Sequence, residues 1–314
     1  MTERVPLFVE LCCGSAAVTL RLIGGPNARP PISYMGSKRG YAEAILNVLG
    51  LRSGQGADAV VLVEAGPWAR AWRLLTTPEG CRAVADVIRG WVGEDARALW
   101  DRLRAEPVPE DAAEAVGAWL IVNGQSVQKG GEGGASWFTR PNGEGQRSVG
   151  SFVSDCAALS ALSWPPVRVV EGDVCGVEPR EVARWLWLHG RSWGRKGAQA
   201  GFDGHTSDDD CPRCGGRCWA KTLSPAGMAE SLDAPPWPPT VVAQADVGQV
   251  RPGVLPEGTV TLIDPPYHGD GTRKITGYAH TLSREQLVDV ALRWEKAGAT
   301  VCVCECVPVA ELVA

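Results

Sequence analysis

The stretch TVTLIDPPY, residues 259–267, decides how the rest of the chain is interpreted. Its apolar half predicts a buried strand. The two prolines after Asp264 end that strand, because proline cannot donate to a sheet ladder. In an open α/β sheet, ligands bind at the carboxyl ends of the strands. We therefore expect Asp264 and Tyr267 to stand at the mouth of a binding crevice.

Asp264, the neighbouring backbone carbonyls and Tyr267 suit a planar group that carries an exocyclic amine. The carboxylate and a carbonyl would each accept one amine hydrogen, while the planar group stacks on the tyrosine ring. Enzymes that act on a nucleobase swung out of the double helix hold their target in this way. The alternative for the motif alone is a strand end followed by a turn.

The motif Asp264-Pro265-Pro266-Tyr267 resembles the catalytic motif of Dam-like DNA adenine-N6 methyltransferases of bacterial or phage type, which use S-adenosylmethionine (SAM). The resemblance implies that Asp264 and the Pro265 carbonyl bond the amine, and that Tyr267 stacks on the flipped base. Cytosine-N4 methylation is an alternative, because the same acceptors fit either amine. A further alternative is a non-catalytic DNA-binding protein that keeps the fold.

A second part of the resemblance lies near the N-terminus. Residues 7–11 predict a strand, and a turn of small residues and a helix follow, which is the first unit of a nucleotide-binding sheet. The family has an acid-x-Phe-x-Gly-x-Gly pattern here that holds SAM. Cys12 replaces the aromatic residue, and Ala16 replaces the second glycine and leaves less room. The cofactor residues implied by this match are Glu10, Cys12, Gly14, Ser15 and Ala16.

Two further matches concern the cofactor. Tyr34, Gly36 and Lys38 resemble the aromatic-x-Gly-Ser-Lys motif that closes over SAM, although here it follows the SAM loop, so the motif order is rearranged. The alternative is a surface turn with two basic residues. Residues 59–64 predict the second strand, whose terminal acid, Glu64, is placed to bond ribose hydroxyls. The alternative role for Glu64 is to cap the next helix.

An internal repeat relates residues 164–173, WPPVRVVEGD, to residues 237–246, WPPTVVAQAD. Each copy predicts an approach loop, a strand and a terminal acid. The family has one such strand before its catalytic strand, and its acid contacts the adenine of the cofactor. We favour Asp246 for that contact, because it precedes Asp264 by 18 residues, whereas Asp173 precedes it by 91.

The insertion at residues 178–236 contains the sequence CPRCGGRC. Cys211, Cys214 and Cys218 have spacings found in structural zinc sites, and His205 is the nearest candidate for a fourth ligand. Zinc would provide the fold that this polar segment cannot obtain from burial. The alternatives are Cys175 or an acidic residue as the fourth ligand, or a reduced Cys-Gly turn without metal. We expect the insertion to recognise the DNA target.

Residues 77–127 predict helices, with Thr77 as an N-cap, and residues 130–150 predict a long Gly-rich loop. The loop carries basic and aromatic side chains, which suit a nucleic-acid backbone and an unstacked base. The side chains that we expect to serve this purpose are Lys129, Arg140, Arg147, Trp137 and Phe138.

Composition and charge argue against three classes of protein: those that coat nucleic acid, those that span a membrane and those that are secreted. The chain has 314 residues and a formal net charge of −5, which argues against a broadly basic surface that coats nucleic acid. Its apolar runs are too short for a membrane span. Eleven cysteines without a secretory signal favour reduced thiols and a cytoplasmic location.

These observations predict an α/β protein with a Rossmann-like SAM-dependent methyltransferase sheet, a helical region and an inserted module that binds zinc in our favoured interpretation. The expected parts are a SAM-binding part (1–76), a helical region with a substrate loop (77–163), a sheet strand (164–177), the insertion (178–236) and a catalytic part (237–314). The expected ligands are SAM, one structural zinc and double-stranded DNA; a partner endonuclease is left open.

Overall fold

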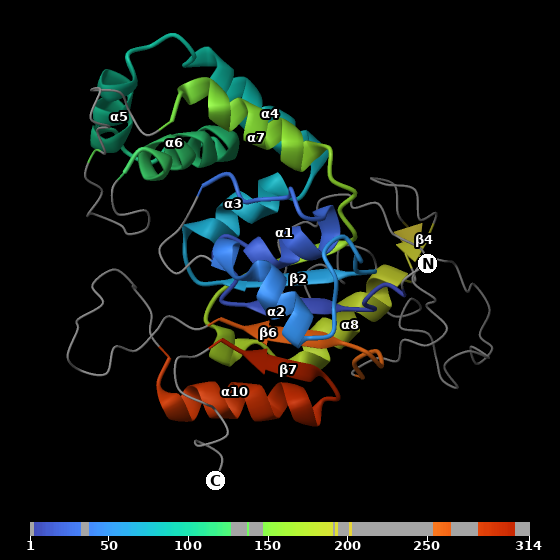
Figure 1. Cartoon of the computed structure of the whole chain (residues 1–314). Helices are drawn as coiled ribbons and strands as arrows, with labels where there is room; N and C mark the ends of the chain where they lie inside the picture. The colour runs from blue at the N-terminus through green and yellow to red at the C-terminus, as the bar shows by residue number, and fades with distance from the viewer. Residues whose placement is uncertain are drawn as a thin grey trace.

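The computed structural model describes residues 3–32, 38–126, 137, 147–190, 192–193, 201–202, 254–264 and 282–304. Its centre is a five-stranded parallel sheet with the strand order β3-β2-β1-β6-β7 (Figure 1). This confirms the predicted α/β class and is consistent with a Rossmann-like fold. The strands are β1 (Phe8–Leu11), β2 (Val60–Glu64), β3 (Val167–Glu171), β6 (Val260–Ile263) and β7 (Thr300–Val303).

The strand order reverses between β1 and β6. From β1 the chain adds β2 and β3 on one side of the sheet, and later adds β6 and β7 on the other. Leu11 pairs with Val63 on one side and with Ile263 on the other, so the carboxyl ends of these strands are level. Open α/β sheets bind their ligands at such a reversal point. The residues that follow β1 and β6 therefore lie where a ligand is expected.

Helices cover both faces of the sheet (Figure 1). Phe8 and Val9 point to opposite faces, because side chains alternate along a strand, and each belongs to a different hydrophobic cluster. Burial on both faces explains the largely apolar sequences of the inner strands β2 and β6. One cluster includes α1 (Ala17–Gly24), α2 (Ala42–Val48) and α3 (Pro67–Leu75); the other includes α8 (Pro179–Gly190) and α10 (Arg284–Lys296).

A helical unit stands beyond α3 (Figure 1). It consists of α4 (Pro78–Gly90), α5 (Ala96–Ala105), α6 (Ala112–Gly124) and α7 (Val149–Ser160). Thr77 caps α4 by accepting from the Gly80 N–H, as predicted, and Pro78 occupies the first turn. Asp95 and Asp111 cap α5 and α6 in the same way. These caps divide the helical stretch into separate helices.

The first copy of the repeat forms β3, which lies at one edge of the described sheet. The second copy, residues 237–246, lies outside the described residues. In the insertion, the structure describes only β4 (Ser192–Trp193) and β5 (Gly201–Phe202) after α8, and these two strands pair antiparallel. The predicted zinc ligands His205, Cys211, Cys214 and Cys218 are also outside the described residues.

Two negative findings apply only to the described ranges. They contain no cluster of three or more His, Cys, Asp or Glu side chains that could hold a metal ion. They also contain no helix that is long and apolar enough to cross a membrane.

Candidate active site

The loop between β1 and α1 has an unusual backbone. Cys12, Gly14 and Ala16 have φ angles of 56°, 45° and 47°, all in the left-handed region. Glycine adopts this region readily, whereas other residues do so at a cost of roughly 1–2 kcal/mol each. Ala16 is fully buried at the N-cap of α1, where the resemblance placed the second glycine. Ala16 thus adopts a backbone conformation that glycine favours, and strain of this kind is concentrated at ligand sites.

Both backbone polar groups of Gly14 form hydrogen bonds with side chains. Its N–H donates to Glu64 Oε2 at 2.7 Å, and its carbonyl accepts from Trp72 Nε1 at 2.8 Å. The other Glu64 oxygen, Oε1, accepts from the Gly66 N–H at 3.0 Å. Glu64, predicted to bond ribose, therefore ties together the loops that follow β1 and β2. The neighbouring Ser15 is buried in the same loop.

No role for Trp72 was predicted from the sequence, and its bond to the loop was missed. The available signal is chemical: the indole N–H is a donor that usually finds a partner when tryptophan is buried.

Glu10, the predicted acid of the SAM loop, lies inside the protein at 2% exposure. Its Oε2 accepts from the backbone N–H of Thr19 at 3.1 Å and from the Thr19 hydroxyl. Burial raises the pKa of Glu10 to about 7, and the nearby negative charge of Asp264 adds to this rise. The Thr19 hydrogen bonds and the Lys38 charge act in the opposite direction. Glu10 is thus a buried carboxyl whose pKa lies near neutral pH.

Asp264 follows β6 directly, and its N–H donates to the Leu11 carbonyl at 3.1 Å. Its carboxylate forms an ion pair with Lys38, which begins the 3-10 helix η1 (Lys38–Gly40). The two side chains are only 14% and 8% exposed. The structure therefore joins two motifs that were predicted separately. Their other members, Tyr34, Gly36, Pro265, Pro266 and Tyr267, lie outside the described residues.

The first acid of the repeat reaches the same edge of the sheet. The Gly172 N–H donates to the Glu64 carbonyl at 3.0 Å, which extends the pairing of β3 with β2. Asp173 then caps the 3-10 helix η2 (Val174–Gly176), accepting from the Cys175 N–H at 2.9 Å. Asp246, which we favoured for the cofactor contact, is not among the described residues. The choice between the two acids stays a prediction.

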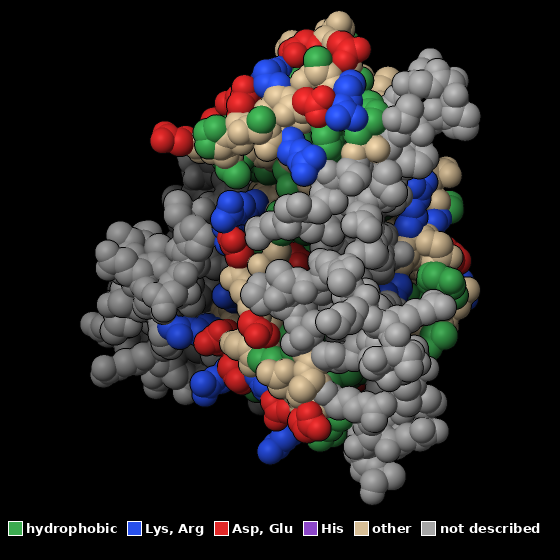
Figure 2. Space-filling view, turned by 90° about the vertical axis from the view of Figure 1, so that its left-hand side faces the viewer, with side chains coloured by type: hydrophobic (Ala, Val, Ile, Leu, Met, Phe, Trp, Pro, Cys, Tyr) green, Lys and Arg blue, Asp and Glu red, His purple; other side chains and the backbone are tan. Residues whose placement is uncertain are grey.

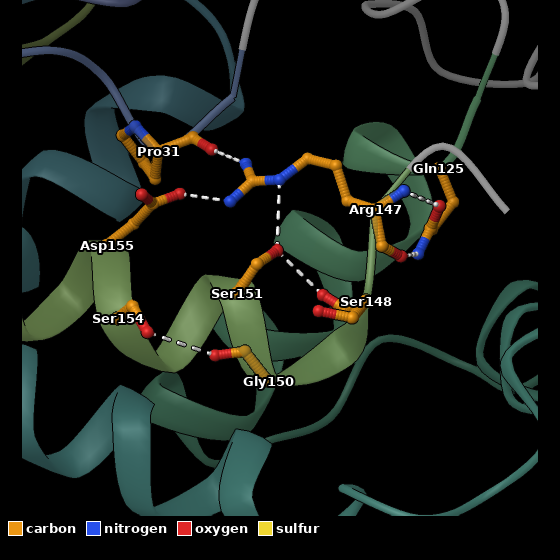
Figure 3. Close-up of polar contacts among 8 residues, drawn as sticks. All are labelled: Pro31, Gln125, Arg147, Ser148, Gly150, Ser151, Ser154 and Asp155. Carbon is orange, nitrogen blue, oxygen red and sulfur yellow. Dashed lines mark hydrogen bonds and ion pairs between the residues drawn. The ribbon is translucent and has the colours of Figure 1, made fainter.

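Arg147, expected to contact nucleic acid, is directed inward (Figure 3). Its guanidinium bonds the Pro31 carbonyl and the Asp155 carboxylate, and its Nε donates to Ser151 Oγ at 3.1 Å. Its Cζ also lies 4.2 Å from the centre of the Phe152 ring. The expectation was therefore wrong for Arg147. The reason is that its partners come from distant segments, which a local composition argument cannot reveal.

Trp137, which was also expected to contact nucleic acid, packs against the helical unit. Trp137 makes an edge contact with Trp100 of α5, with ring centres 5.7 Å apart, and Arg97 lies over the Trp137 ring. Lys129, Phe138 and Arg140 are outside the described residues. On the face drawn in Figure 2, the described acidic and basic side chains are interspersed, in keeping with the net charge of −5.

Comparison with known proteins finds no family model, no curated protein and no solved structure that matches the chain. Any functional conclusion must therefore come from the chemistry of the site.

The first prediction concerns Glu10. Between pH 4.5 and about 7 the folded state binds more protons at this group than the unfolded state, so stability should fall as pH rises. Glu10→Gln keeps the shape without the charge, and should remove up to about 3 kcal/mol of this loss. Urea unfolding at several pH values measures it. Identical pH profiles for the variant and the wild type would contradict the assignment.

The second prediction concerns Arg147. Arg147→Met leaves Asp155, whose side chain is 13% exposed, without its cation. We expect the free energy of unfolding to fall by about 1–3 kcal/mol, because a poorly solvated charge loses its partner. Arg102→Met is the matched control, since the Arg102–Glu94 pair is about 40% exposed and should contribute little. Equal stability of the two variants in urea unfolding would show that the cluster is unimportant.

Proposed function

We propose that this protein transfers a methyl group from SAM to the exocyclic N6 amine of adenine in DNA. The observation that carries the proposal is the meeting of Asp264, Lys38 and the loop at residues 12–16 where the strand order reverses. Each of these resembles a different motif of one enzyme family, and Lys38 and Asp264 are 226 residues apart in the chain. Their convergence at a ligand-binding edge is what a common function requires.

The described residues fit the cofactor. The strained turn brings backbone close to the edge of the sheet, and the amino end of α1 follows it. Glu64 Oε2 accepts the Gly14 N–H and Oε1 accepts the Gly66 N–H, and a carboxylate can accept several donors, a ribose hydroxyl among them. When bound, SAM supplies the methyl group.

A second acid near the cofactor is also indicated. Asp173 follows the strand next to β2, at the same edge as Glu64. Its position supports Asp173 as a candidate for the adenine contact of the cofactor alongside Asp246.

Asp264 would act on the amine that receives the methyl group. Its carboxylate and the Pro265 carbonyl would accept the two amine hydrogens and concentrate lone-pair density on nitrogen, while Tyr267 stacks on the base. Lys38 balances the buried carboxylate and orients it before substrate arrives. Such advance positioning of polar groups accounts for much of enzymatic rate enhancement.

We assign target recognition to the insertion, most of which lies outside the described residues. We propose that the insertion at residues 178–236 contacts the duplex, with one structural zinc on Cys211, Cys214, Cys218 and His205.

The direct test is to incubate the protein with DNA and methyl-labelled SAM, digest the DNA and identify the labelled nucleoside. We expect N6-methyladenosine in its deoxy form. Labelled N4-methylcytosine would establish the alternative target. Absence of both products, together with no SAM binding by calorimetry, would overturn the proposal.

The third prediction is that Asp264→Ala lowers the rate of methyl transfer at least about a hundredfold, while the variant still binds SAM. Losing a hydrogen bond made in the transition state costs on the order of 3 kcal/mol, or roughly a hundredfold in rate. Asp101→Ala is the control, because Asp101 is an exposed partner of Arg97 on α5. Unimpaired turnover of the Asp264 variant would sink the assignment.

The fourth prediction concerns Lys38. Lys38→Met should lower kcat by at least about tenfold, because the Asp264 carboxylate loses the charge that holds it. Lys38→Arg keeps the charge and should recover part of the loss. The exposed neighbour Arg39 provides the control, Arg39→Met, for loss of a basic side chain from the same segment. Equal kcat values for the Lys38 and Arg39 methionine variants would contradict the role given to the ion pair.

A further inference from the structure

Trp72 lies outside the loop at residues 12–16 but forms a hydrogen bond with it. The side chain is fully buried on α3, and its Nε1–H donates to the Gly14 carbonyl at 2.8 Å. On the other side of the same residue, Glu64 accepts the Gly14 N–H at 2.7 Å. We propose that Trp72 is a positioning residue that, with Glu64, sets the orientation of the Gly14 backbone and so the shape of the loop. The identity of the ligand that this loop holds rests on the function proposed above.

The loop needs such an external bond. Cys12 and Ala16 are non-glycine residues in the left-handed region, on either side of Gly14. Each disfavours this conformation, so the loop would relax unless the surrounding structure held it. A donor to the central carbonyl acts directly against that relaxation. Within the described residues, removing the indole would leave the Gly14 carbonyl only the weaker Cys13 thiol as a donor, at 3.9 Å.

The indole is itself held in place by other rings. It stacks on Trp68, with ring centres 5.3 Å apart and planes 12° apart, and it lies 6.2 Å from Trp164. Trp68 in turn makes an edge contact at 4.8 Å with Trp119 of α6. These contacts restrict rotation of the Trp72 side chain, so the direction of its N–H is set by packing.

This arrangement gives the helical unit a part in the site. A continuous path of contacts runs from Trp119 in α6 through Trp68 and Trp72 to Gly14. The helical unit therefore supports the loop through α3.

Two variants separate positioning from packing. Trp72→Phe removes the indole N–H and one ring. Trp68→Phe removes the same atoms from the stacked neighbour, which lies one turn earlier and is equally buried. Both variants lose aromatic packing, so a difference between them reports the bond to Gly14.

Hydrogen exchange measured without any ligand is the first readout. We expect a peptide spanning residues 11–17 to exchange roughly tenfold faster in Trp72→Phe than in Trp68→Phe, since a hydrogen bond to the loop has been lost. The second readout is SAM affinity by calorimetry, where Trp72→Phe should raise Kd by about tenfold and Trp68→Phe should raise it less, because that variant keeps the Trp72 N–H.

Equal loop exchange and equal SAM affinity in the two variants would overturn the positioning role of Trp72. A wild-type protein that does not bind SAM would overturn the proposed function instead, and the exchange comparison would still decide this inference. If Trp72→Phe does not fold, replacing Trp72 with 3-benzothienylalanine keeps the two-ring shape and lacks the N–H. Unchanged loop exchange with that side chain would likewise refute the proposal.

Discussion

The ion pair between Lys38 and Asp264 is the interaction on which the site depends. It joins a segment just after the first sheet unit to the end of β6, 226 residues later. Both side chains are largely withdrawn from solvent, and a charge in that setting is strongly destabilising when its partner is absent. The parallel sheet places Asp264 beside the end of β1, and the pair then fixes η1 against the same edge. The result is a carboxylate with a defined position next to the loop at residues 12–16.

The loop at residues 12–16 is the second element of the site, and side chains from neighbouring elements hold its backbone in place. Its own residues are poorly suited to the left-handed backbone at Cys12 and Ala16. Glu64 and Trp72 compensate by holding Gly14 on both sides, and Glu10 supports the start of α1 through Thr19. Burial raises the pKa of Glu10 to about 7, so this carboxyl keeps a proton more readily than an exposed glutamate does. This limits the negative charge close to Asp264.

Much of the sheet could be predicted from sequence, because its signals are local. The apolar runs at residues 7–11 and 59–64 became β1 and β2, and the run ended by Asp264 and the prolines became β6. The position of Asp264 at a carboxyl edge followed from its place after a strand. The N-cap of α4 at Thr77 was also a local signal and was confirmed.

The contacts that complete the site could not be predicted from the sequence, because they join segments that are far apart in the chain. The pairing of Lys38 with Asp264 depends on the order of the strands, and no spacing along the chain encodes it. Arg147 seemed suited to a phosphate until its partners Pro31 and Asp155 were placed around it. Glu64 was correctly placed at a strand end, but its bonds to Gly14 and Gly66 depend on how two loops meet.

The central claim is that SAM binds across the ends of β1 and β2, beside Asp264. Hydrogen exchange of the wild-type protein with and without saturating SAM tests this most directly. The account predicts slower exchange in peptides covering residues 11–19 and 63–68, with unchanged exchange in α5, which lies in the helical unit. SAM that leaves the peptides after β1 and β2 unprotected, or that protects only other parts of the protein, would contradict the account.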